Sequence, residues 1–224
     1  VTKAAINKVK SPLNEYLLIS ERSAWKLIRK WSKISEEFAF YRFREACGLE
    51  PHPKFHLFYD WSKSKTTSPR ELFPSLEITE VHHLDLSVSS SWLGLKEEFN
   101  DLDLFKFKIK QLQKQKPKKI LAGGYLEPRS LYTSESYNKV GNNGLEKRCI
   151  HLGIDFWVPK YTPVHSPYNG TIVKVFNDQG EKAYGGTIIL KHDTKSFTFY
   201  TLYGHLALES IQKVGVGSKI LKGD

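Results

Sequence analysis

The sequence predicts an α+β protein in which a helix-rich region is followed by a compact, antiparallel all-β domain. Apolar residues recur at helical spacing before about residue 116, whereas from Lys119 onward short apolar runs alternate with turns. A content of 40% apolar and 13% aromatic residues in 224 residues is sufficient to bury a core. We expect a helical leader with its linker over 1–120 and the sheet domain over 121–224.

The first predicted elements are two helices between Ser20 and Ala46. Apolar residues recur there every three or four positions, and Gly48 follows as a stop signal. The polar, proline-containing stretch over 63–74 is expected to be a loop or linker. A strand is expected at Glu77–Val88.

A third helix is predicted directly before the change in character. Asp101 is a suitable N-cap, and the helix should end near Lys116, because Pro117 cannot continue it. Its apolar stripe consists of Leu102, Phe105, Ile109 and Leu112.

Much of the net charge of +10 is concentrated on this helix and the residues after it. Seven lysines lie between Lys106 and Lys119, without interleaved aromatic residues and without a recognisable nucleic-acid-binding motif. We interpret them as a solvated helix face. A nucleic-acid binder driven by these lysines is the alternative, but no nucleic-acid partner is expected.

The second half reads as strands joined by tight turns. Polar and apolar residues alternate within the runs, and Asn-Gly dipeptides such as Asn143-Gly144 and Asn169-Gly170 separate them. The predicted strands lie within residues 118–125, 148–158, 170–176, 185–193 and 196–206.

The remaining composition bears on compartment and partners. Cys47 and Cys149 form no disulfide framework or metal-binding pair, so we interpret them as buried small residues or free thiols. No apolar run approaches the roughly 20 residues that cross a bilayer, so no membrane partner is expected. The start at Val1 and the absence of methionine suggest a piece of a longer chain. The lack of a signal peptide favours the cytoplasm.

Two segments carry residues suited to chemistry. His151 and Asp155 are four residues apart, so on a strand both side chains point to one side, where zinc could accept them as ligands. The spacing alone also fits a structural role, with His151 donating to a backbone carbonyl and Asp155 capping a turn. His205, at the end of an aromatic strand, could act as a general base or stabilise a developing charge.

The wider pattern favours the metal site. The stretch HLGIDFWVPKYTPVHSPYNGTIVKV, with the later YGGTIILKHD and FYTLYGHL, resembles the lysostaphin-like (LytM-type) zinc metallopeptidases over residues about 148–224. The resemblance implies a barrel-sandwich-like peptidase domain that cleaves amide bonds in a peptide or peptidoglycan-like substrate. It implies that His151 and Asp155 are zinc ligands and that His205 is catalytic.

One part of the family pattern is missing from these residues. Members of the family carry a later His-x-His motif that supplies the third zinc ligand and another catalytic histidine, and no such motif occurs before Asp224. The chain as given is therefore expected to lack the third ligand and to be inactive, or to be a non-catalytic scaffold with the peptidase fold. His192 and His165 are expected to have ordinary structural roles.

The first half has a partial resemblance of its own. The phrases FAFYRFREACGLEPHP, LDLSVSSSWLG and GGYLEPRSLYTS resemble the segment that precedes a peptidase-like module in multidomain proteins, between a kinase-like and a class III aminotransferase-like domain. This resemblance implies a cytoplasmic parent protein whose neighbouring domains are partners of the peptidase-like module.

Overall fold

The computed structural model describes residues 54–133, 135–141, 144–180 and 182–224. The chain divides into two compact units, Val1–Tyr59 and Asp60–Asp224. Of the first unit, the described residues are the start of helix α5 (Phe55–Lys63). The two helices predicted between Ser20 and Ala46 lie outside the described residues.

One short helix, α6 (Pro69–Leu72), lies within the stretch 63–74 that was expected to be a loop or linker, and a second, α7 (Lys96–Asn100), lies shortly before the predicted third helix. In α6 the Glu71 carboxylate accepts the backbone N–H of Ser68, which precedes the helix, at 2.9 Å. In α7 Glu98 accepts the N–H of Leu95 at 2.8 Å in the same way. Both carboxylates satisfy a backbone donor at the start of a helix.

The predicted third helix is confirmed as α8 (Leu102–Gln115). The Asp101 side chain accepts the N–H groups of Asp103 and Leu104, both at 3.0 Å, which is the predicted N-cap. Ile109 of the predicted apolar stripe is buried. Leu102 of the same stripe is 52% exposed, because it is the first residue of α8 and lies beyond the part of the helix that packs on the core.

A small mixed sheet lies against α8. Strand β1 (Glu80–Leu84) pairs in parallel with β2 (Lys119–Gly123), and β7 (Phe156–Trp157) pairs antiparallel with the other edge of β2. A parallel pair needs a long crossover connection, and α7 and α8 lie within that connection. The sequence predicts antiparallel pairing for the strands from Lys119 onward. β2 departs from this prediction, because its partner β1 precedes α7 and α8 and the crossover through these helices makes the two strands parallel.

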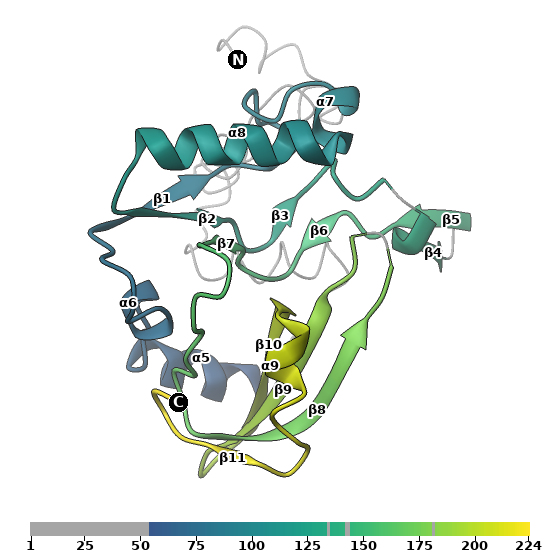
Figure 1. Ribbon diagram of the computed structural model, residues 1–224. Helices are drawn as coiled ribbons and strands as arrows, with labels where there is room; N and C mark the ends of the chain where they lie inside the picture. Colours follow the sequence, from purple (N-terminus) through teal and green to yellow (C-terminus); the bar gives the residue numbers. More distant parts are fainter. Residues whose placement is uncertain (1–53, 134, 142–143, 181) are drawn as a thin grey trace, which may run out of the picture. The chain divides into compact units, whose positions relative to one another are not determined.

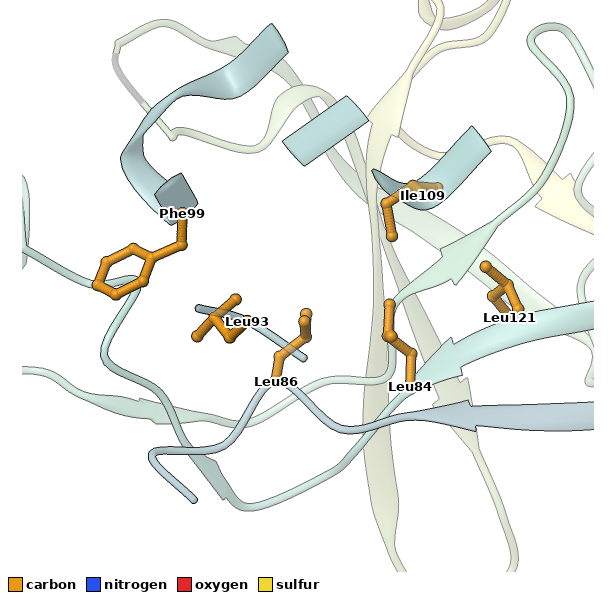
Figure 2. Close-up of a cluster of buried hydrophobic side chains, with 6 residues drawn as sticks. All are labelled: Leu84, Leu86, Leu93, Phe99, Ile109 and Leu121. Atoms are coloured by element: carbon orange, nitrogen blue, oxygen red, sulfur yellow. The ribbon is translucent and has the colours of Figure 1, made fainter. Parts of the chain in front are cut away.

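The main apolar core fills the space between α8 and this sheet (Figure 2). Leu121 of β2 is fully buried and Leu84 of β1 is 3% exposed. The cluster consists of Leu84, Leu86, Leu93, Phe99, Ile109 and Leu121. Residues on both sides of position 120 therefore share one core. The domain boundary predicted between residues 120 and 121 stays a prediction.

The largest sheet is the predicted antiparallel one, with strand order β10-β9-β8-β11. Figure 1 shows its long strands curling together. Its strands are β8 (Gly170–Asp178), β9 (Gly185–Asp193), β10 (Thr198–Leu206) and β11 (Lys219–Ile220), with the short helix α9 (Leu208–Ile211) after β10.

His192 lies inside this sheet, where a structural role had been predicted. Its side chain is 2% exposed, with Nδ1 at 2.8 Å from the carbonyl oxygen of Asn169 and Nε2 at 2.7 Å from the Thr201 hydroxyl. The Phe199 ring stacks on the imidazole at 4.7 Å between centroids. Both ring nitrogens are thus engaged, which confirms the structural interpretation.

Two short ribbons connect the sheets. Strand β3 (Glu127–Pro128) pairs with β6 (Ile150–His151), and β4 (Asn138–Gly141) pairs with β5 (Gly144–Lys147). The 3-10 helix η1 (Glu135–Tyr137) leads into β4. The β3–β6 ribbon joins the part of the chain before residue 130 to the segment that carries His151.

The lysines of α8, the cysteines and the apolar content of the helices can be compared with what the sequence predicts. Of the lysines expected to form a solvated face, Lys106, Lys110 and Lys114 are exposed on α8, whereas Lys108 is half-buried and packs over the Trp92 ring. Cys149 is an exposed free thiol, whereas Cys47 lies outside the described residues. Within the described part of the chain, no helix has the length and apolar content that crossing a bilayer requires.

The first prediction concerns the end of the β9–β10 hairpin. A Cβ on Gly186 would clash with the carbonyl oxygen of Leu206, so Gly186→Ala must force the two backbones apart. We expect a loss of about 1–3 kcal/mol in the free energy of unfolding, measured by urea denaturation. Gly215→Ala is the matched control, because nothing lies within 4 Å of its added Cβ, and it should leave stability almost unchanged. Equal effects of the two changes would contradict the close approach.

Candidate metal centre

His151 and Asp155 come together between two short strands. His151 ends β6 and Asp155 immediately precedes β7, and the intervening residues bring the side chains back toward each other. The distance from His151 Nε2 to Asp155 Oδ1 is 3.4 Å. The side chains are 15% and 31% exposed, so the pair is largely shielded but reachable from solvent.

The orientation of the imidazole is fixed by the backbone of the preceding sheet. His151 Nδ1 lies 3.1 Å from the carbonyl oxygen of Gly124, and in the β3–β6 ribbon His151 is the partner of Glu127. A carbonyl can only accept, so Nδ1 is the donor there and Nε2 is directed at Asp155. The structural interpretation expected His151 to donate to a backbone carbonyl, and this contact is present. The metal-site interpretation expected His151 and Asp155 to lie side by side, and they do.

A buried arginine holds the other oxygen of Asp155. Arg129 Nη1 is 2.6 Å from Asp155 Oδ2, and Arg129 Nε is 2.6 Å from Glu127 Oε2. Arg129 and Glu127 are 4% and 6% exposed. The remaining Glu127 oxygen accepts the backbone N–H of Leu86 at 2.9 Å. Burial of these two charges is possible because each is paired with the other and hydrogen-bonded further.

Sequence reasoning missed both Glu127 and Arg129. They lie in GGYLEPRSLYTS, and no metal-ligand or catalytic spacing in the sequence includes them. Two opposite charges two residues apart usually indicate a solvated surface. Their burial results from tertiary packing that a local pattern does not reveal.

These contacts keep Asp155 ionised. Burial by itself would raise the pKa of the carboxyl, but the hydrogen bond from His151 and the charge of Arg129 outweigh it and lower the pKa to about 2. Burial raises the pKa of the neighbouring Tyr132 to about 12, so its phenol stays protonated. The Tyr132 ring lies 6.5 Å from the His151 ring, between centroids.

The spacing of the two donors fits a tetrahedral metal ion. Zinc bound at ~2.0–2.1 Å by nitrogen and oxygen places two tetrahedral donors about 3.3 Å apart, and the observed separation of Nε2 and Oδ1 is 3.4 Å. The backbone acceptor on the other imidazole nitrogen is the usual outer partner of a histidine ligand. Within the described ranges, no cluster of three or more His, Cys, Asp or Glu side chains could hold a metal ion.

His205 lies at an irregular end of β10. The β9–β10 register shifts between Tyr203 and Leu206, and His205 has a left-handed backbone with φ of 57°. Its N–H donates to the carbonyl oxygen of Tyr184 at 2.6 Å, and its side chain is exposed. In the described part of the chain, no hydrogen bond or ion pair joins it to His151 or Asp155.

The loop before β9 nevertheless ties the His205 region to the segment around Tyr132. Lys182 Nζ donates to the carbonyl oxygen of Leu131 at 2.9 Å, and the Tyr137 hydroxyl donates to the carbonyl oxygen of Lys182 at 3.0 Å. The rings of Tyr137 and Tyr132 are 4.5 Å apart, and Tyr132 neighbours His151. The same loop reaches Tyr184, which accepts from His205.

The last histidine considered, His165, belongs to a different part of the molecule. Its Nδ1 lies 2.6 Å from the carbonyl oxygen of Gly223, and the backbone N–H of Ser166 donates to Asp224 at 2.8 Å. His165 therefore joins the segment before β8 to the last described residues. This contact agrees with the structural role predicted for it.

The fold combines a curled antiparallel sheet with a histidine and an aspartate that meet outside that sheet, at the end of β6 and the start of β7, where they could bind a metal ion. Residues 149–224 match the model of peptidase family M23, which confirms the predicted LytM-type domain over about a third of the chain. No curated protein and no solved structure matches the chain. Arg129 and Glu127 lie outside the matched residues. The resemblance stated for the first half stays a prediction.

The second prediction concerns the buried charges. Arg129→Met leaves Glu127 buried without its partner, so we expect a loss of about 3–5 kcal/mol in the free energy of unfolding, measured by urea denaturation. Adding Glu127→Gln should recover most of that loss, because no unpaired charge remains.

Lys222→Met is the matched control for this prediction. It breaks an ion pair of similar length, 2.9 Å to Glu71, but both side chains are solvent-exposed. Its effect on stability should be small. A loss in Lys222→Met as large as that in Arg129→Met would contradict the burial argument.

Proposed function

We propose that this protein is a metal-dependent amide hydrolase, a peptidase that uses zinc held by His151 and Asp155. The observation that carries the proposal is the 3.4 Å separation of Nε2 and Oδ1, within a stretch that matches peptidase family M23. His151 and Asp155 are also the two residues to which the sequence resemblance assigns zinc binding. A zinc site needs at least one further protein ligand besides this pair.

The chemistry of the proposed site divides between the ion and the chain. Bound zinc lowers the pKa of a coordinated water and polarises the scissile carbonyl. Asp155 offers an ionised carboxylate, because its pKa of about 2 keeps it charged at neutral pH. His151 would offer Nε2 once a metal ion replaces the proton through which Nε2 contacts Asp155, because its Nδ1–H is engaged by Gly124.

Two further side chains are suited to act on the substrate. His205 is exposed at the end of β10, so a substrate can reach its imidazole, which we propose as the general base or as the group that stabilises the charge developing on the carbonyl oxygen. The phenol of Tyr132 stays protonated beside the pair, so it can act as a hydrogen-bond donor but not as a base.

The proposed substrate is a peptide or a peptidoglycan-like polymer. This part rests on the family match and on the exposed apolar side chains beside the pair, Leu152 at 55% and Ile154 at 56% exposed. Apolar side chains at the rim of a site suit a peptide better than a highly charged polymer.

The test is the zinc content of the natural full-length protein. Elemental analysis should give about one zinc per chain, lost in His151→Ala and in Asp155→Ala. His56→Ala is the control, because this exposed histidine of α5 lies away from the pair in sequence and should leave the zinc content unchanged. A zinc-free wild-type protein would contradict the proposal and favour a non-catalytic scaffold.

His205 is tested by separating binding from rate. His205→Ala should keep its zinc while hydrolysis of a peptide library falls by about 10²–10⁴-fold, the range for loss of a general acid or base. Undiminished hydrolysis in His205→Ala would remove the catalytic assignment without affecting the zinc ligands.

A further inference from the structure

The two carboxylate oxygens of Asp155 have different surroundings, and this difference suggests a role for a residue outside the family match. Oδ2 is held by Arg129 Nη1 at 2.6 Å, whereas Oδ1 faces His151 Nε2. We infer that Arg129, anchored by Glu127, is a positioning residue that restricts Asp155 to binding the metal through Oδ1 alone. The inference rests on the proposed function.

Arg129 is fixed before it reaches Asp155. Its Nε is paired with Glu127 Oε2 at 2.6 Å, and its backbone N–H donates to the carbonyl oxygen of Cys149 at 2.7 Å. Glu127 is in turn held by the N–H of Leu86. Since Arg129 is 4% exposed, its guanidinium has little room to move, and Nη1 is presented to Asp155 from a rigid base.

The space around the guanidinium is equally restricted. A Cβ on Gly123 would lie 2.6 Å from Arg129 Nη2 and 3.3 Å from the Trp157 ring. The backbone N–H of Gly123 also donates to the carbonyl oxygen of Asp155 at 2.8 Å. Gly123, the last residue of β2, therefore lies close to the Arg129 guanidinium and is hydrogen-bonded to the backbone of Asp155.

The consequence for a metal is a choice between two modes of carboxylate binding. A free carboxylate can bind through one oxygen or through both, and the second mode adds a ligand to the coordination sphere. With Oδ2 engaged by a charged donor, only Oδ1 is available, next to Nε2. Outer partners of this kind usually change metal affinity by 10–100-fold when they are removed.

This role places the segment before residue 149 in the metal centre. Glu127 and Arg129 belong to β3 and the residue after it, and Leu86 follows β1, so none lies within the stretch that matches peptidase family M23. A domain cut at residue 149 would lose the residues that orient its aspartate.

The experiment uses the natural full-length protein and the Glu127→Gln/Arg129→Met double variant, which removes both buried charges together. Zinc affinity is measured by competition with a chromophoric chelator, and cobalt(II) is bound in place of zinc to record its visible spectrum. We expect 10–100-fold weaker zinc binding and weaker cobalt bands, because a second carboxylate oxygen raises the coordination number. The cobalt spectrum reports on coordination, which a loss of stability alone would not change.

Two single variants accompany the double variant. Arg129→Lys retains a positive donor near Oδ2 and should restore part of the affinity and the spectrum. Gly123→Ala displaces the guanidinium while leaving every charge in place, so it should weaken zinc binding in the same direction. It carries the test if the double variant does not fold by circular dichroism.

The outcomes separate the inference from the proposed function. If the wild-type protein binds zinc through His151 but the folded double variant, or Gly123→Ala in its place, keeps wild-type affinity and cobalt spectrum, the inference is overturned and the proposed function stands. If the wild-type protein binds no zinc, both are overturned. Weaker binding with an altered spectrum in the variants supports the inference.

Discussion

The interaction on which this structure most depends is the buried ion pair between Glu127 and Arg129. Two charges with 6% and 4% exposure are tolerable only if they are paired, and here the pairing also reaches Asp155 and the backbone beside β1, while Arg129 Nη2 is buried without a hydrogen-bond partner among the described residues. The pair therefore binds three segments that are distant in sequence. One of them contributes the proposed metal ligands, so the same contacts that satisfy buried charges also orient the site.

The fold supplies the rigid base that this pair requires. The parallel pairing of β1 with β2 depends on the crossover through α8, and Ile109 of that helix packs with Leu84 and Leu121 in the core. β2 then receives β7 on its other edge. Asp155 directly precedes β7, so the core under α8 determines where its carboxylate can lie. The region before residue 149 thus fixes the position of Asp155 within the stretch that matches peptidase family M23.

Local patterns predicted those parts that local chemistry determines. The N-cap at Asp101 and the three long strands of the large sheet follow from residue type and spacing. His151 and Asp155 do lie together, but not on one strand as the spacing predicted: the chain turns between the end of β6 and the start of β7, and this turn brings the two side chains into contact. The role of Arg129 could not be predicted, because a charged residue directly after a short strand becomes buried only through contacts with distant segments. The left-handed backbone of His205 likewise depends on a register shift against β9.

The most direct test is a crystal structure of the zinc-loaded natural protein, with anomalous diffraction recorded at the zinc edge. We predict an anomalous peak at ~2.0–2.2 Å from both His151 Nε2 and Asp155 Oδ1, with Arg129 still bound to Asp155 Oδ2. A peak at other residues, or no peak in crystals that contain stoichiometric zinc, would contradict the assignment of the metal centre. A zinc ion bound by both Asp155 oxygens would contradict the role given to Arg129.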